Sequence, residues 1–168
     1  MLTLTKVLTN SFMLFIPIHL WNLLLASKLI GKIRLDNPNL VVPCAITTLE
    51  IFFRFVVFTL PIFMHFDFTL RKEKIGFILY SAGIVVYFLS WIPHLFPIFK
   101  GLRKRLLFFI APALTPIIWL IGIGLMSKPY FNFINLPMGS GSEIYCLTAT
   151  IFVFFHCAHV TFAFLKLE

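Results

Sequence analysis

Five long apolar segments divide the 168-residue sequence. A helix needs about 20 mostly apolar residues to cross the hydrocarbon core of a bilayer. The segments that meet this requirement cover residues 7–29, 44–66, 75–99, 106–126 and 144–165. The sequence therefore predicts an all-α integral membrane protein, built as a compact bundle of five transmembrane helices joined by short loops.

The composition supports this prediction and excludes a water-soluble globule. Hydrophobic residues make up 60% of the chain and charged residues 12%, and the mean hydropathy is +1.00. Soluble domains contain roughly a quarter charged residues. We expect residues 1–168 to form a single transmembrane domain without a separate soluble catalytic module. The first segment is expected to be a retained span, because no small-residue cleavage site follows it.

The net charge of +8 comes from Lys and Arg residues that lie almost entirely between the apolar segments. That position is typical of orientation signals and of contacts with anionic lipids. We therefore expect membrane lipids as partners and no nucleic acid. One side of the membrane collects Lys28, Lys32, Arg34, Lys100, Arg103, Lys104, Arg105 and Lys166, and the other collects Lys6, Arg71, Lys72, Lys74 and Lys128. The positive-inside rule then predicts an outside N-terminus and a cytosolic C-terminus.

Glu50 and Arg54 stand four residues apart inside the second apolar segment. On a helix in water, such a pair contributes a few tenths of a kcal/mol. In hydrocarbon a lone charge costs several times more, so an ionisable residue there points to function. Two interpretations stay open: a structural ion pair that locks helix packing, or a ligand-binding or proton-handling carboxylate held by the guanidinium.

Further polar side chains are expected at a similar depth, as judged from about 1.5 Å of rise per helical residue. They gather in the half of the bundle predicted to be cytosolic. The candidate ligand-binding residues are Glu50, Arg54, His156, His159, Asn22, His19 and Tyr87. The sequence therefore predicts a polar pocket for a small amphipathic or lipid-like ligand. Gly76 and Gly83 share a helix face with Tyr87 and would permit close helix approach.

The histidines have three interpretations: packing residues with hydrogen bonds, lining of a polar pocket, or ligands of a metal or haem. No metal site and no cofactor is predicted, because the five histidines are scattered and no metal-binding motif is present. A haem held by two histidines would require His19 and His156, the pair at matched depth. The three cysteines are expected to pack as small apolar residues.

Two other functions remain open from the sequence. One is a membrane-embedded enzyme acting on a lipid or isoprenoid, with Glu50 as general acid or base and His156 or His159 as its partner. The other is a non-catalytic subunit of a membrane complex, in which the polar stripe meets a helix of a homo- or hetero-oligomeric partner. No hydrolase or phosphate-binding motif favours one specific reaction, and the catalytic residues are unknown.

Overall fold

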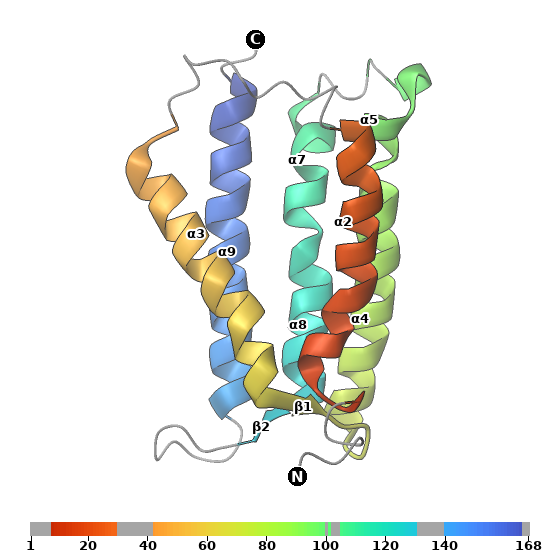
Figure 1. The fold of residues 1–168 in the computed structure, drawn as a ribbon, viewed down its shortest axis with the longest axis vertical. Coiled ribbons are helices and arrows are strands. Elements are labelled where there is room, and N and C mark those ends of the chain that lie inside the picture. The colour runs from red at the N-terminus through yellow and green to blue at the C-terminus, as the bar shows by residue number, and fades with distance from the viewer. Residues whose placement is uncertain (1–7, 30–41, 100, 102–104, 131–139, 166–168) are drawn as a thin grey trace.

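The computed structural model describes residues 8–29, 42–99, 101, 105–130 and 140–165. It confirms the all-α membrane bundle, because four helices are long and apolar enough to cross a bilayer. These are Cys44–Phe63, Arg71–Leu95, Leu106–Met126 and Gly141–Leu165, and a shorter apolar helix, Ser11–Leu25, precedes them. The helices run roughly alongside one another, with α3 (Cys44–Thr59) tilted across α9 (Ser140–Leu165) (Figure 1).

The first segment differs from the expected continuous span over residues 7–29, of which residue 7 lies outside the described part. The chain forms a 3₁₀ helix, η1 (Ser11–Phe15), and then α2 (Ile16–Leu29). The Asn10 side chain caps η1 by accepting a hydrogen bond of 2.9 Å from the Phe12 N–H. Pro17 follows at the start of α2, where its fixed φ suits the first helical turn.

The second segment was expected to be helical through residue 66, and this prediction is wrong at its end. Helix α3 gives way to the 3₁₀ helix η2 (Leu60–Phe63), and residues Met64–Phe66 form strand β1. Pro61 accounts for the change, because proline disfavours helix at the preceding residue and cannot donate an N–H. Strand β1 pairs antiparallel with β2 (Ser127–Pro129), with His65 opposite Lys128.

The third segment begins earlier than expected and is broken near its end. Helix α4 (Arg71–Ser90) is followed by α5 (Ile92–Leu95) and η3 (Pro97–Phe99). The early start follows from Glu73, whose carboxylate accepts a hydrogen bond of 2.7 Å from the Leu70 N–H. A side chain that satisfies a free N–H at this position stabilises the first helical turn.

The fourth segment keeps its expected bounds but contains an interruption. It consists of α7 (Leu106–Leu114) and α8 (Pro116–Met126), which meet at Thr115. Pro116 lacks the N–H that would continue the α7 ladder, so the helix is broken between the two parts. The fifth segment, expected over residues 144–165, begins four residues earlier as α9.

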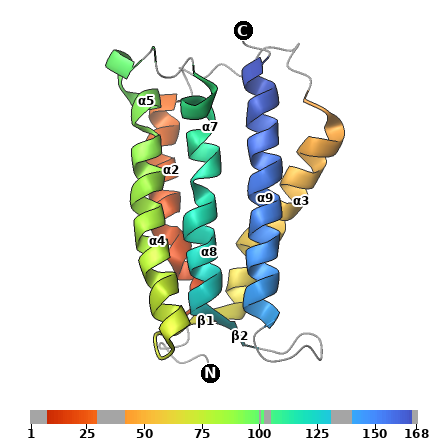
Figure 2. The same ribbon diagram turned by 180° about the vertical axis from the view of Figure 1, so that it is seen from behind.

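Helices α4 and α8 lie side by side along their length (Figures 1 and 2). The expected close approach at Gly76 and Gly83 is confirmed. A Cβ on Gly76 would lie 2.8 Å from the carbonyl oxygen of Gly122, and one on Gly83 would lie 2.5 Å from the backbone nitrogen of Trp119. Around this contact the core contains the fully buried side chains of Leu120, Ile123, Met126 and Tyr145.

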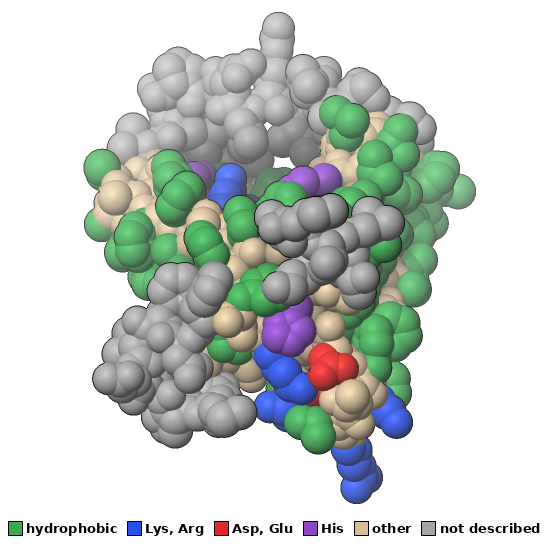
Figure 3. Space-filling model, turned by 60° about the horizontal axis from the view of Figure 1, so that its bottom comes forward, with side chains coloured by type: hydrophobic (Ala, Val, Ile, Leu, Met, Phe, Trp, Pro, Cys, Tyr) green, Lys and Arg blue, Asp and Glu red, His purple; other side chains and the backbone are tan. Residues whose placement is uncertain are grey.

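The β1–β2 sheet closes one end of the bundle together with a charged cluster. Lys128 Nζ lies 3.0 Å from Asp67 Oδ2 and 2.7 Å from Glu73 Oε1. The hydrogen bond from Lys128, followed by those from the Phe68 N–H and Thr69, lowers the pKa of Asp67 to about 2. Figure 3 looks toward this end and shows acidic, basic and histidine side chains beside apolar ones.

Candidate functional site

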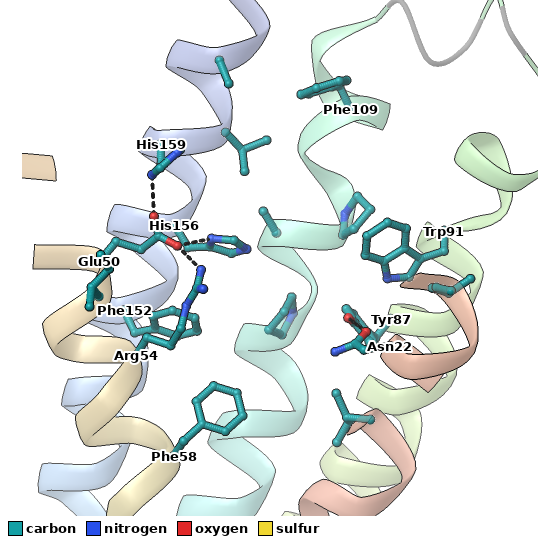
Figure 4. Close-up of a pocket in the computed structure, with 18 of the residues that line it drawn as sticks. Asn22, Glu50, Arg54, Phe58, Tyr87, Trp91, Phe109, Phe152, His156 and His159 are labelled. Atoms are coloured by element: carbon teal, nitrogen blue, oxygen red, sulfur yellow. Dashed lines mark hydrogen bonds and ion pairs between the residues drawn. The ribbon is translucent and has the colours of Figure 1, made fainter. Parts of the chain in front are cut away.

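A cavity of about 690 Å³ lies among α2, α3, α4, α7, α8 and α9, mainly in the half of the bundle farther from the β1–β2 sheet (Figure 4). Its size falls within the roughly 300–1,000 Å³ of small-molecule sites. The lining is largely aromatic and aliphatic, and its polar side chains form two groups on opposite sides. Phe58, Phe109, Trp119 and Phe152 belong to the apolar part.

The first polar group surrounds the carboxylate of Glu50, which is only 3% exposed. Arg54 donates a hydrogen bond to Glu50 Oε1, and His156 Nδ1 lies 2.9 Å from the same oxygen. His159 Nδ1 lies 2.6 Å from Glu50 Oε2, in a close ion-pair contact rather than a well-directed hydrogen bond. Three basic side chains thus converge on one buried carboxylate (Figure 4). We call these four residues the Glu50 cluster.

Helix periodicity explains how the Glu50 cluster forms. Glu50 and Arg54 are four residues apart on α3, and His156 and His159 are three apart on α9, so each pair shares a helix face. Helix α3 packs against α9 and brings the two faces together. A lone charge among long apolar stretches is costly, so pairing of these side chains across the two helices is favoured.

The contacts also constrain the histidine protons. An ionised carboxylate only accepts hydrogen bonds, so His156 Nδ1 carries the proton of its contact when Glu50 is ionised. The second ring nitrogen of each histidine is then left for another group. The imidazole of His156 extends from α9 into the cavity, with its second nitrogen on the side away from Glu50 (Figure 4).

The second polar group lies across the cavity, on α2 and α4. The Tyr87 hydroxyl donates a hydrogen bond of 2.6 Å to Asn22 Oδ1. Trp91 stands beside them, and Trp119 contributes a side chain that is 2% exposed. The indole N–H of Trp119 has no acceptor among the residues that the structure describes.

The structure places six of the seven candidate residues on this cavity: Glu50, Arg54, His156, His159, Asn22 and Tyr87. His19 is outside the cavity lining. Its ring packs against Phe15, with ring centroids 6.0 Å apart, and against Phe58 at 5.6 Å. Of the pair considered for haem, His19 therefore lies off the cavity and His156 is in contact with Glu50.

The candidate ligand-binding residues predicted from the sequence did not include the tryptophan and proline residues of the lining. Trp91, Trp119, Pro112 and Pro116 all contribute to the cavity wall. A signal was available for Trp91, because it follows Tyr87 by four residues and therefore shares its helix face. His94, seven residues after Tyr87, lies on the same face and also lines the cavity.

Within the described ranges, no group of three or more His, Cys, Asp or Glu side chains is arranged to hold a metal ion. Comparison of the chain with known protein families, curated proteins and solved structures found no match.

Proposed function

We propose that this protein, whose apolar helices fit a multi-pass membrane protein, binds a small amphipathic, lipid-like molecule in the cavity. The head of the ligand would contact the Glu50 cluster, and its apolar part would lie against Phe58, Phe109 and Trp119. The observation that carries this proposal is the separation of polar and apolar side chains within one cavity of small-molecule size. By the positive-inside rule, the site would open in the cytosolic half of the membrane.

The arrangement of α2 and α3 supports access from the bilayer. The two helices are in contact toward the β1–β2 end, where the rings of His19 on α2 and Phe58 on α3 are 5.6 Å apart. They diverge toward the other end (Figure 1). There Asn22 of α2 and Arg54 of α3 both line the cavity and are both exposed. A molecule dissolved in the membrane would reach the cavity between these helices without crossing water.

Tryptophan fluorescence offers a direct test, because two of the three tryptophans line the cavity. A variant with Trp21→Phe and Trp91→Phe retains Trp119 alone, and we call it the Trp119 reporter. Single-chain amphiphiles with brominated chains quench a tryptophan only at near contact. We expect saturable quenching of the Trp119 reporter in nanodiscs, because its side chain is buried and reachable only through the cavity.

The matched control is the variant that retains Trp21 alone. Trp21 stacks on Phe88, with ring centroids 4.4 Å apart, and does not line the cavity. Its quenching should rise in proportion to the amphiphile in the bilayer, without saturation. Brominated phospholipid in the nanodisc provides the background for both variants. Quenching of Trp119 no stronger than this background would refute the proposal.

Replacing Glu50 with Gln separates ligand binding from a purely structural ion pair. The amide keeps the shape of the side chain but removes the charge that holds Arg54, His156 and His159 in place. A binding site should lose affinity for the amphiphile in the Trp119 reporter. A structural pair should lose thermal stability alone, with unchanged quenching by the amphiphile.

A membrane-embedded enzyme acting on a lipid or isoprenoid is the second candidate, and the Glu50–His156 contact favours it. A carboxylate that binds one histidine nitrogen orients the ring and leaves the other nitrogen available as a general base or acid. Mass spectrometry of membrane lipids incubated with the purified protein would detect turnover. Glu50→Gln should abolish any product while the protein remains folded.

A further inference from the structure

Arg54 has more hydrogen-bond donors than the Glu50 cluster can use. A guanidinium provides five N–H donors. Among the described contacts it donates to Glu50, and its Cζ atom lies 5.9 Å from the centre of the Phe152 ring. Its side chain is 48% exposed, whereas that of Glu50 is 4% exposed. Several charged N–H groups of Arg54 therefore remain accessible at membrane depth, where a missing acceptor is costly.

The carboxylate oxygens of Glu50 and the amide oxygen of Asn22 are already engaged on the cavity wall. Glu50 Oε1 receives Arg54 and His156, and Oε2 faces His159. On the opposite side, the Tyr87 hydroxyl occupies Asn22 Oδ1. The second ring nitrogens of His156 and His159 can accept or donate, depending on protonation. The other N–H groups of Arg54, the amide NH₂ of Asn22 and the indole N–H of Trp119 can only donate, so donors predominate on this wall. A ligand that supplies acceptor oxygens complements this wall.

The net charge of the cavity lining also favours a ligand with acceptor oxygens. Glu50 is the sole carboxylate among the described lining residues, and Arg54 is permanently protonated. With Glu50 ionised, these two charges cancel, and each protonated histidine in the cluster then adds a positive charge. With Glu50 neutral, the cluster is positive from Arg54 alone. Protonation of His94, which also lines the cavity, would only add to the positive charge. No protonation state of these groups makes the wall negative.

We infer that the cavity selects amphiphiles with an anionic oxygen head, a carboxylate or a phosphate monoester, and that Arg54 is the residue that recognises it. This inference rests on the proposed function. A guanidinium can bind either head through two parallel N–H···O bonds. A cavity of about 690 Å³ holds a single small molecule, so the ligand has one chain.

The test compares four amphiphiles that share one brominated chain and differ in the head: carboxylate, phosphate, alcohol and ammonium. Saturable quenching of the Trp119 reporter gives an affinity for each, corrected for its partition into the nanodisc. The anions should bind about tenfold more tightly than the alcohol, since hydrogen bonds with charged partners are about 1–1.5 kcal/mol stronger than neutral ones. The ammonium should bind more weakly than the alcohol.

Arg54→Gln in the Trp119 reporter should reduce the affinity for both anions to that for the alcohol and leave the alcohol unchanged. Arg54→Lys retains a positive charge and should keep part of the preference. The matched control is Arg105→Gln, which removes one positive charge at the N-cap of α7, outside the cavity lining. It should change none of the four affinities.

The outcomes separate this inference from the proposed function. The relative affinities of the carboxylate and phosphate amphiphiles identify which head the site prefers. Equal affinity for the anions and the alcohol, or tightest binding of the ammonium, would overturn the anionic head while leaving amphiphile binding intact. Unchanged anion affinity in folded Arg54→Gln would overturn the role of Arg54. Saturable quenching by none of the four would overturn amphiphile binding itself.

Discussion

Gly83 on α4 touches the backbone of α8 so closely that replacing it with alanine should force the two helices apart. The added Cβ would lie 2.5 Å from the Trp119 nitrogen and 2.9 Å from its Cα and Cβ. Non-bonded carbon atoms prefer separations of about 3.5–4.0 Å, so relief requires a shift of roughly 1 Å. Because two of the opposing atoms are backbone atoms, no side-chain rotation can provide it.

The expected loss of stability follows from two opposing effects. Overpacking of a well-packed core typically costs about 1–3 kcal/mol, and the upper end applies where backbone must move. Alanine in place of glycine also favours the helix by up to about 1 kcal/mol. We therefore expect Gly83→Ala to lower the free energy of unfolding by about 2 kcal/mol. The shift should also displace Trp119 in the cavity wall and weaken its quenching by a bound amphiphile.

Reversible unfolding in mixed detergent micelles measures the effect, with two other glycines as controls. A Cβ on Gly101 meets no atom within 4 Å, so Gly101→Ala should change stability little. A Cβ on Gly124 would clash most closely with the Cys146 sulfur, a side-chain atom that can rotate away, so Gly124→Ala should fall between the two. If Gly83→Ala were as stable as Gly101→Ala, the close-contact argument would be wrong.

Two further predictions concern the charged cluster at the β1–β2 end. Lys128→Met leaves the Glu73 carboxylate, whose side chain is 0% exposed, without its cation. This substitution should lower the free energy of unfolding by up to about 3 kcal/mol, the low end for a broken buried ion pair, because Lys128 is partly exposed. An unfolding midpoint equal to that of the unmodified protein would contradict this prediction. Since hydrogen bonds from Lys128, the Phe68 N–H and Thr69 lower the pKa of Asp67 from 3.8 to about 2, its stabilising contribution is complete above about pH 4 and is lost as pH falls toward 2. The free energy of unfolding of Asp67→Asn should therefore fall less between about pH 4 and about pH 2 than that of the unmodified protein. The same pH dependence in both proteins would refute the role of Asp67.

Helical spacing made much of the candidate site predictable. The four-residue interval between Glu50 and Arg54 and the three-residue interval between His156 and His159 each define a face. To predict the Glu50 cluster, one further assumption was needed: charged side chains at the same depth in hydrocarbon form contacts with one another. The observed contacts between these residues fit that assumption.

His19 shows where depth counting fails. It lies at the expected level but turns away from the cavity, while Ile18 and Asn22 of the same helix line it. Successive residues of an α-helix are rotated by about 100°, so a neighbour at the same depth can face another direction. Apolar residues are distributed around the whole of α2, and its sequence therefore contains little information about its rotation.

The β1–β2 pairing could not be predicted either, because its two strands are far apart in the sequence. Residues 64–66 continue an apolar run that by itself resembles the end of a spanning helix. Pro61 indicates that this helix should weaken, yet it does not identify Ser127–Pro129 as the pairing partner. Such pairing depends on where the ends of α3 and α8 meet in space.

The two ends of the bundle should tolerate evolutionary divergence to different degrees. At the β1–β2 end, backbone groups connect distant segments: Phe66 donates to Thr9, Asp67 to Met126 and Tyr130 to Phe63. Peptide groups are the same in every residue except proline, so these connections survive most side-chain replacements. At the other end, α3 and α9 are connected through side chains: the Glu50 cluster and ring contacts such as that of Phe53 with Phe155. Distant homologues should therefore retain segment lengths at the first end and residue identities at the second.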